Sequence, residues 1–482
     1  MARFNRSNMR RKIIVISDLH VGAGPLDDCD AELEGCLVRF LRECSLGDTP
    51  VELVINGDFL DFVQAEPWEG ADFETEHEGV PLCFTQNQSA NKFKAMNKAH
   101  RPIFKGLGDF LGAHPENALV VLPGNHDADF FWPDVRGLFR ESVAGESEDI
   151  RGRILFHLEQ CYRPESSPGV WIEHGHQYDP NNRFFIDTNE IDRVSGSKIK
   201  KAVWSEEDLP IFKDETGTER LFECGGTRFM IRFMNGLDAN YPFVDNVKPF
   251  SRFLRIFGVS TFNPRYKLLP QAASVWQMLR YLVKEGINYP ASLLSLERPA
   301  DGIGPSALLQ ALVGAMTDAD VAWFVGELEV RGFALNTHPK MFVNNPEKAE
   351  RLMTFLSENV DLLRRLEQVK LPVLGFAPGT LSMGKAFFVD ETQELVKAAQ
   401  KILNKEGVTY AIMGHTHEPV DGRRYINTGC WTRYYRFGSD EDMRSWDVLK
   451  ENSYQQFPYE LRYAEVVPGQ PPQAKVFEEK KS

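Results

Sequence analysis

The sequence predicts a layered α/β domain that is interrupted by a long, mainly helical insertion. Two observations carry the α/β prediction. Five short runs rich in β-branched residues each end in a polar cluster, and segments with helical spacing of apolar residues lie between the early runs. The five runs are KIIVISDLH, VELVINGDFLD, ALVVLPGNHD, GVWIEHGHQ and VTYAIMGHTHE.

The first elements follow one another in the order strand, helix, strand. KIIVISDLH covers residues 12–20, and the apolar residues of DCDAELEGCLVRFLREC, at 28–44, recur with helical spacing. VELVINGDFLD follows at 51–61. A second helical pattern, at 91–114, precedes ALVVLPGNHD at 118–127. This alternation predicts a sheet whose faces are covered by helices.

The insertion is indicated by a change of pattern between the fourth and fifth runs. Long helical patterns such as NPEKAERLMTFLSENVDLLRRLEQVK occur there, and the last of them, TQELVKAAQKILNKEG, fits either the insertion or the core. We therefore expect residues 1–187 to form the first part of the core and residues 188–408 a mainly helical cap. Residues 409–482 are expected to form the last part of the core and a frayed C-terminal tail.

Composition excludes several classes of protein. The net charge of the 482 residues is −14, which argues against broad, sequence-independent binding to nucleic acid. The seven cysteines include no CxxC pair, so neither a disulfide framework nor a cysteine zinc site is expected. The apolar run after the basic N-terminus is too short for a signal peptide, and no run is long enough to span a membrane. A cytoplasmic location and, at most, peripheral membrane contact are expected.

The polar clusters are where ligands should bind. Loops that leave the carboxyl ends of strands converge at one edge of an open α/β sheet. Six of the eleven histidines fall in these clusters. The clusters supply Asp18, His20, Asp58, Asn125, His126, Asp127, His174, His176, His415 and His417.

The spacing and chemistry of these residues point to metal ions. Asp18 and His20 are two residues apart, as are His415 and His417, and residues at this spacing lie on one side of an extended chain. Carboxylate, imidazole and amide oxygen together suit divalent ions such as manganese, iron or zinc. About seven such ligands fit two metal ions better than one, and paired metal ions are used in phosphoryl displacement.

The full series of motifs resembles the calcineurin-like metallophosphoesterase superfamily. D-x-H, G-D, G-N-H-D, H-G-H and G-H-T-H stand in the family's order, over residues 12–180 and 409–430. The resemblance implies a four-layer α/β/β/α sandwich core with two divalent metal ions, manganese first and iron, zinc or magnesium as alternatives. It assigns Asp18, His20 and His417 to one metal, Asn125, His174 and His415 to the other, and Asp58 to both.

The resemblance also implies a mechanism. His126 would face the scissile phosphate, where it stabilises charge or protonates the leaving oxygen, and Asp127 would hold its orientation. The nucleophile would be a metal-bridging hydroxide. GNHD differs from the GNRD of the UDP-2,3-diacylglucosamine pyrophosphatases, which also carry a helical cap, so their substrate is not carried over.

Other residues are candidates for substrate contact. Asn181, Asn182 and Arg183, in YDPNNRF, could bind a phosphate or sugar, since arginine suits bidentate contact with an oxyanion. His176 is interpreted as a substrate contact, a residue that supports the ligands, or a purely structural residue. Asp61 and Trp68 follow Asp58 in a loop whose role is either functional or simple packing.

These observations predict a phosphoesterase that hydrolyses a phosphate mono- or diester selected by the cap. A small molecule or lipid is favoured over nucleic acid. The alternatives are a nuclease that uses the same site and a non-catalytic metal-binding scaffold or membrane-associated interaction protein. The basic and aromatic segment 246–267 fits a membrane or anionic-substrate surface, a cap helix with a solvated basic face, or a platform for single-stranded nucleic acid. Oligomeric state is left open.

Overall fold

The chain forms two compact units in a computed structural model. The first unit consists of residues 1–249, 391–436 and 452–482, and the second of residues 250–390 and 437–451. The structure describes residues 11–65, 84–179, 181–191, 198–214, 216–235, 246–248, 318–343, 391–436 and 454–480, with residue 313 and scattered residues between 345 and 362.

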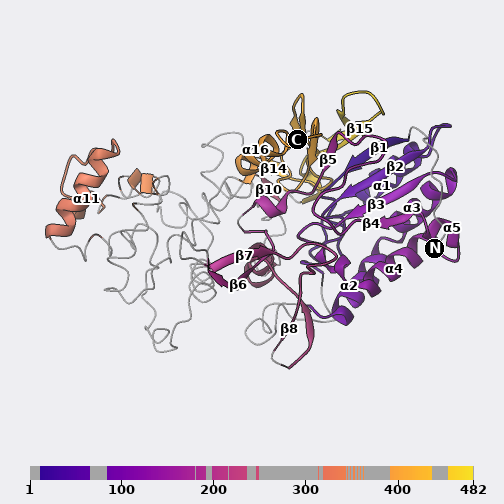
Figure 1. Cartoon of the computed structure of the whole chain (residues 1–482), viewed down its shortest axis with the longest axis horizontal. Coiled ribbons are helices and arrows are strands. Elements are labelled where there is room, and N and C mark those ends of the chain that lie inside the picture. Colours follow the sequence, from indigo (N-terminus) through magenta and orange to yellow (C-terminus); the bar gives the residue numbers. More distant parts are fainter. Residues whose placement is uncertain are drawn as a thin grey trace. The chain divides into compact units, whose positions relative to one another are not determined.

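A six-stranded sheet is the centre of the first unit (Figure 1). Its order is β16-β15-β1-β2-β3-β4. The strands β1 to β4 are parallel, and β15 runs antiparallel to β1 and to β16. The bounds are β1 (Lys12–Ile16), β2 (Val51–Asn56), β3 (Ala118–Leu122), β4 (Ile154–Phe156), β15 (Tyr459–Val466) and β16 (Gln473–Lys480).

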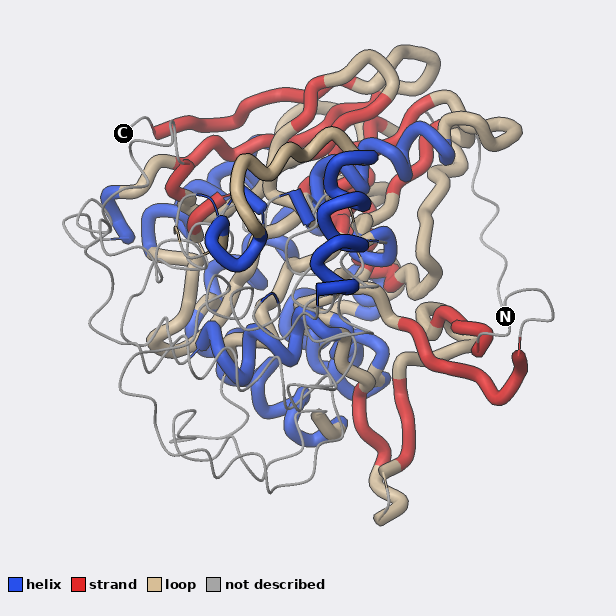
Figure 2. Tube along the Cα trace, turned by 90° about the vertical axis from the view of Figure 1, so that its left-hand side faces the viewer, coloured by secondary structure: helices blue, strands red, loops and turns tan. Residues whose placement is uncertain are grey.

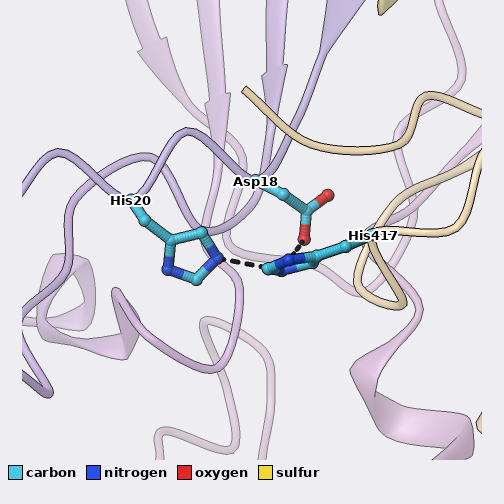
Figure 3. Close-up of side chains that lie close together, drawn as sticks. All are labelled: Asp18, His20 and His417. Carbon is cyan, nitrogen blue, oxygen red and sulfur yellow. Dashed lines mark hydrogen bonds and ion pairs between the residues drawn. The ribbon is translucent and has the colours of Figure 1, made fainter. Parts of the chain in front are cut away.

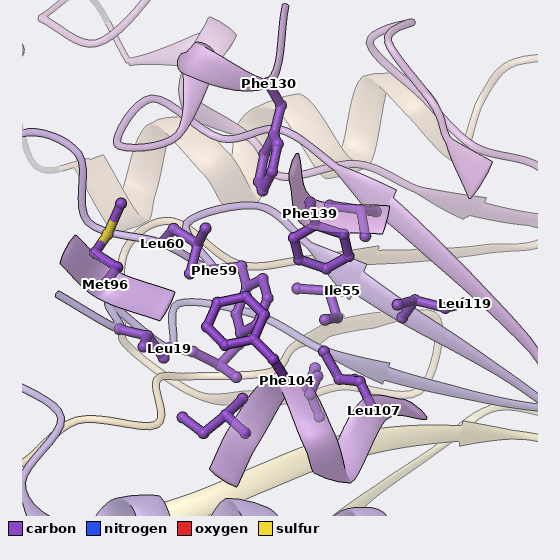
Figure 4. Packing of buried hydrophobic residues seen from close by; sticks show 14 of the residues in the cluster. Leu19, Ile55, Phe59, Leu60, Met96, Phe104, Leu107, Leu119, Phe130 and Phe139 are labelled. Carbon is purple, nitrogen blue, oxygen red and sulfur yellow. The ribbon is translucent and has the colours of Figure 1, made fainter. Parts of the chain in front are cut away.

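Helices cover one face of this sheet, as the alternating sequence predicts. Ile55 of β2 points to that face, where Phe104 and Phe139 pack in the same buried cluster (Figure 4). Asp30 caps the N-terminus of the first helix, because its side chain accepts the backbone N–H groups of Glu32 and Leu33. The helices are α1 (Ala31–Cys44), α2 (Gln86–Ala99), α3 (Arg101–Ala113), α4 (Pro133–Ala144) and the short α5 (Glu148–Arg151).

The other face of the sheet packs on a second sheet. Val54 and Val120 share a buried cluster with Ile172 and Ile412, since successive strand residues point to opposite faces. The second sheet has the order β12-β13-β11-β5, in which β11 is parallel to both neighbours. Its strands are β5 (Val170–Ile172), β11 (Tyr410–Met413), β12 (Val420–Asp421) and β13 (Tyr425–Asn427).

The helix α16 (Glu391–Ile402) packs its buried residues against the second sheet. Leu395 and Ala399 lie in one cluster with Ala411 and Met413 of β11. This helix is the TQELVKAAQKIL segment, and it lies in the first compact unit with the strands of the core. Its apolar residues meet the core because strand β11 follows it after a short turn.

The segment after β5 differs from the expected helical pattern. Residues 185–221 contain two hairpins, which Figure 2 shows as paired strands standing apart from the larger sheets. The sequence FIDTNEI contains β-branched residues that favour strands.

The first unit also extends to residue 249, beyond the expected boundary at 187. The elements are β6 (Phe185–Ile191), β7 (Lys198–Ala202), β8 (Ile211–Lys213), β9 (Glu219–Leu221), α6 (Gly225–Phe229) and β10 (Val247–Lys248), which pairs with β14 (Tyr435–Arg436).

The expected fraying of the C-terminal segment is wrong for residues 473–480. They form β16, which pairs with β15 over its length. The turn residues of VVPGQPP separate the two strands, so what looks like a polar tail is the second arm of a hairpin.

The described secondary structure of the second unit is helical. It includes α11 (Asp318–Val330) and α12 (Pro339–Phe342), and Phe324, Leu328 and Phe342 share its buried cluster. Of the basic and aromatic segment, residues 249–267 lie outside the described residues. None of the described helices has the length and apolar composition that crossing a bilayer requires.

Candidate metal centre

The loops that follow β1 and β2 lie side by side at the carboxyl edge of the main sheet. The backbone N–H of Asp18 donates to the carbonyl of Gly57 at 3.1 Å, and that of His20 to the carbonyl of Asp58 at 3.0 Å. The parallel pairing of Ile16 with Ile55 sets this register. The two motifs D-x-H and G-D therefore come together directly.

Backbone strain marks the same residues. Among the described residues, those other than glycine with positive φ are five of the predicted ligands. This conformation is costly for a residue with a Cβ, and it persists where surrounding structure or function holds it. The five are Asp18 (φ 55°), His20 (45°), Asp58 (50°), His415 (71°) and His417 (56°).

Asp18, His20 and His417 form one group of potential metal ligands (Figure 3). The Nε2 atoms of the two histidines lie 3.0 Å apart, and Nε2 of His417 lies 3.4 Å from Oδ1 of Asp18. Nδ1–H of His20 donates to Oδ2 of Asp61 at 2.9 Å, which leaves the lone pair of His20 on Nε2, facing the group.

Asp58, His174 and His415 form a second group. Nε2 of His174 lies 3.0 Å from Oδ2 of Asp58, and its Nδ1–H donates to the carbonyl of Asn56 at 2.9 Å. This bond turns Nε2 of His174 toward the carboxylate. The backbone N–H of His415 donates to both carboxylate oxygens of Asp18, so the two groups are joined through the chain.

Asp58 lies between the two groups. Its Oδ2 is 3.0 Å from Nε2 of His174 and 4.0 Å from Nε2 of His20. Burial alone raises the pKa of this carboxyl, but the neighbouring histidines, His174 first, hold it well below its usual value. A buried carboxylate held ionised between two sets of imidazoles is suited to neutralisation by cations.

Asn125 tests whether a cation fits here. Its side chain is buried, and Oδ1 has no hydrogen-bond partner among the described residues, whereas Nδ2 donates to Oδ1 of Asn182 at 3.4 Å. A buried carbonyl oxygen without a partner is costly unless something binds it. Together with the imidazole and carboxylate groups, it makes a donor set that fits divalent metal ions.

His126 lies beside the first group, and its ring is held by Asp61. Its Nδ1–H donates to Oδ2 of Asp61 at 3.1 Å, and the rings of His126 and His20 are 4.6 Å apart. Burial lowers the pKa of His126, but the charges of Asp61 and Asp58 outweigh this effect and raise it to about 9. The sequence left the role of Asp61 open between function and loop packing. In the structure its carboxylate is the hydrogen-bond partner of the His126 ring.

Asp127 does not have the contact expected of it. Its carboxylate accepts backbone N–H groups of Gly124 at 2.5 Å, Phe59 at 2.8 Å and Asp58 at 3.3 Å, and no contact with the His126 ring is found in the described structure. The side chain turns to these N–H groups because they point inward from two tight loops. Asp127 therefore joins the G-D and G-N-H-D loops, and Asp61 replaces it as the partner of His126.

The tentative substrate residues are placed differently from one another. His176 is buried and packs edge-on against Trp204, with ring centroids 4.3 Å apart, and neither ring nitrogen has a hydrogen-bond partner among the described residues. Asn181 is half-buried, and Arg183 is exposed with its guanidinium over the ring of Phe185. Trp68 lies outside the described residues.

The G-H-T-H loop is braced from the following strand. The side-chain amide of Asn427 donates to the carbonyl of Gly414 at 2.8 Å and to the hydroxyl of Thr416 at 3.1 Å. Thr428 lies 2.6 Å from the hydroxyl of Ser17, which in turn donates to Asp18. These polar residues hold the G-H-T-H loop and Asp18 in place.

Comparison with known proteins agrees with this geometry. The family model described as calcineurin-like phosphoesterase matches residues 11–225. Residues 11–225 are therefore similar to this family. The match confirms the resemblance noted in the sequence for this part of the chain, and such a domain implies a hydrolase with metal-binding residues. No curated protein and no solved structure gave a significant match.

Residues beyond the matched range lie in the same sheet as residues within it. His415 and His417 follow β11, which pairs in parallel with β5, the strand that ends just before His174. The G-H-T-H motif is therefore far from the other motifs along the chain, while the second sheet brings it back to the same edge.

Proposed function

We propose that this protein is a two-metal phosphoesterase that hydrolyses a phosphate mono- or diester of a small molecule or lipid. The observation that carries the proposal is the position of the Asp58 carboxylate, with Oδ2 within 4.0 Å of imidazole nitrogens from both ligand groups. Single histidines at strand ends are common in proteins without metal. A buried carboxylate between two such groups is suited to cations on both sides.

The ligands are assigned from this arrangement. Asp18, His20 and His417 would hold one metal, Asn125, His174 and His415 the other, and Asp58 both. The hydrogen bonds of His20 and His174 support this assignment, because each engages Nδ1 and leaves Nε2 for a metal. Two divalent ions bound there, manganese by preference, would activate water and neutralise charge on the phosphate.

His126 would then act on the phosphate ester directly. Asp61 fixes its ring through Nδ1. The opposite nitrogen, Nε2, is the atom that would donate a hydrogen bond or a proton to the leaving oxygen. The His126 side chain is 15% exposed, more than the 5% of its neighbour His20, as a group that meets substrate must be.

The packing of the core and the composition of the chain support an architecture and a setting for this activity. Helices, two packed sheets and α16 support the four-layer α/β/β/α sandwich for the core. We propose that the residues between β5 and α16 supply a cap that selects the substrate. A small or lipid substrate is favoured over nucleic acid by the net charge of −14, and a cytoplasmic location by the seven cysteines, an odd number that includes no CxxC pair.

The test is a metal-dependent assay of the full chain. Protein stripped of metal and reloaded with MnCl2 is assayed with bis-p-nitrophenyl phosphate and p-nitrophenyl phosphate, with Asp58→Asn as the control, and bound manganese is measured in both proteins. Manganese-dependent release by the wild type alone supports the proposal, and the ratio of rates separates diesterase from monoesterase. Failure of the wild type to bind manganese would overturn it.

A further inference from the structure

Two polar residues outside the predicted ligand set contact two ligands of the same proposed metal. Asp179 contacts His415, and Asn182 contacts Asn125. The two ligands are 290 residues apart in the chain and follow different strands, β11 and β3. Neither Asp179 nor Asn182 belongs to the groups of potential metal ligands found among the described residues.

The Asp179 carboxylate is buried and fully engaged. Its Oδ2 accepts Nε2–H of His415 at 3.1 Å and the side-chain amide of Asn182 at 2.6 Å, while Oδ1 accepts the backbone N–H of Asn181 at 2.8 Å. Only 4% of the residue's surface is exposed. A carboxylate that takes the proton-bearing nitrogen of an imidazole leaves the lone pair on the other nitrogen, Nδ1, and makes it a better metal ligand.

Asn182 orients Asn125 by a hydrogen bond, as Asp179 orients His415. Its Nδ2 is bound to Asp179, so its Oδ1 is available to accept Nδ2–H of Asn125. An amide held through its nitrogen presents its oxygen on the opposite side. This is Oδ1 of Asn125, the buried atom without a hydrogen-bond partner among the described residues.

We propose that Asp179 and Asn182 form a positioning relay that orients His415 and Asn125 toward the second metal. The relay rests on the proposed function, since it serves that metal. In each ligand the hydrogen bond engages the atom that does not bind metal. The four side chains form one chain of hydrogen bonds from His415 through Asp179 and Asn182 to Asn125.

Gly226, at the start of α6, provides a way to disturb the relay without changing any of its members. A Cβ on Gly226 would lie 1.9 Å from Oδ1 of Asn182, so the Asn182 side chain would have to move. A Cβ on the adjacent Gly225 would meet only the backbone oxygen of Asn181, at 3.3 Å. The two glycines share a helix, and Gly225→Ala is therefore a matched control.

The experiment is calorimetric titration of metal-free, full-length protein with MnCl2. The wild type is expected to bind two ions. Asp179→Ala should weaken one of the two sites by about 10–100-fold and leave the other unchanged. Asp179→Asn should weaken it less, because its amide oxygen still accepts the His415 proton. Gly226→Ala should weaken the same site, and Gly225→Ala neither site.

The outcomes separate the relay from the proposed function. Three results would overturn the relay alone, given a wild type that binds two manganese ions. Asp179→Ala could bind both ions with unchanged affinity, it could lose affinity equally at both sites, or the two glycine variants could bind manganese equally well. A wild type that binds no manganese would overturn the two-metal proposal and the relay with it. Thermal unfolding of each metal-free variant identifies a loss of affinity that comes only from misfolding.

Discussion

Asp61 holds His126 by a hydrogen bond of 3.1 Å between Oδ2 and Nδ1. The same oxygen accepts Nδ1–H of His20 at 2.9 Å, and Oδ1 accepts the backbone N–H groups of Val63 and Gln64 at 3.0 Å. One buried carboxylate therefore orients both a proposed metal ligand and the proposed proton donor. Its own position is fixed by the turn that follows it.

This relationship predicts different effects for two substitutions. His126→Ala should lower kcat by about 10²–10⁴-fold and retain both metal ions, because His126 is a proton donor and no ligand. Asp61→Asn should lower kcat and also weaken manganese binding, because His20 loses its partner. Steady-state kinetics combined with bound-metal analysis measures both. Equal metal loss in the two variants would contradict the division of roles.

The strained backbone predicts that metal binding stabilises the fold. Five proposed ligands have positive φ, and Asp18 and Asp58 are buried as carboxylates. A cation that binds only the folded state adds about 2.7 kcal/mol to its stability at 100 times its dissociation constant. Thermal unfolding of the metal-free wild type should shift upward when MnCl2 is added. The shift should be much smaller in Asp58→Asn, and an equal shift in that variant would argue that manganese binds elsewhere.

The sequence anticipated which residues gather at the site better than it anticipated their roles. Strand ends bring the predicted ligands to one sheet edge, and this depends on local pattern alone. The extended backbone assumed from the i, i+2 spacing is wrong, because Asp18, His20, His415 and His417 all have positive φ. The partner of His126 depends on where two loops cross. Asp127 is its neighbour in sequence but turns to backbone N–H groups, while Asp61 reaches it from another loop. Asp179 was overlooked because its neighbours Asn181 and Arg183 suggested substrate contact.

The extent of the core was harder to anticipate. Residues 473–480 look polar and frayed, yet they pair with β15, and edge strands carry polar residues on both faces. The hairpins of residues 185–221 lie in a segment dominated by longer helical patterns downstream. In both cases the segment is a strand because it pairs with a neighbouring strand of a hairpin, and this pairing is not visible in the residues of the segment itself.

His100, at the junction of α2 and α3, predicts a pH-dependent contribution to stability. Its Nδ1 lies 2.8 Å from Oε2 of Glu34 and its Nε2 2.6 Å from Oδ2 of Asp27. Burial lowers the pKa of His100, but the two carboxylates, Asp27 first, raise it above the usual value. The added stability is therefore present below about pH 6.5 and is lost as pH rises through the raised pKa.

The change that tests this contribution is His100→Gln. It should lower the free energy of unfolding by about 1–2 kcal/mol at pH 5.5, and by clearly less at pH 9. Urea unfolding at the two pH values measures the difference. His114→Gln, at the end of α3, is the control for loss of a histidine. A loss that is the same at both pH values would mean that the His100 contacts contribute by packing alone.

Gly124, the first residue of the G-N-H-D loop, lies against Asp58, and there is no space for a side chain at this position. A Cβ at this position would lie 2.2 Å from Oδ1 of Asp58 and 2.6 Å from its backbone nitrogen. The backbone cannot yield easily, because Asp127 ties both loops together. Gly124→Ala should therefore displace Asp58 and reduce manganese binding at both sites, although no ligand is changed.

The matched control is Gly137→Ala in α4, where a Cβ would meet nothing within 4 Å. Alanine is the better helix former, so this variant should be as stable as the wild type or about 1 kcal/mol more stable, with normal manganese binding. Calorimetric titration of both variants provides the comparison. If Gly124→Ala weakens only one site, Asp58 serves one metal and the other ion is held without it. If it weakens both, the close contact between Gly124 and Asp58 is what keeps the shared carboxylate in place.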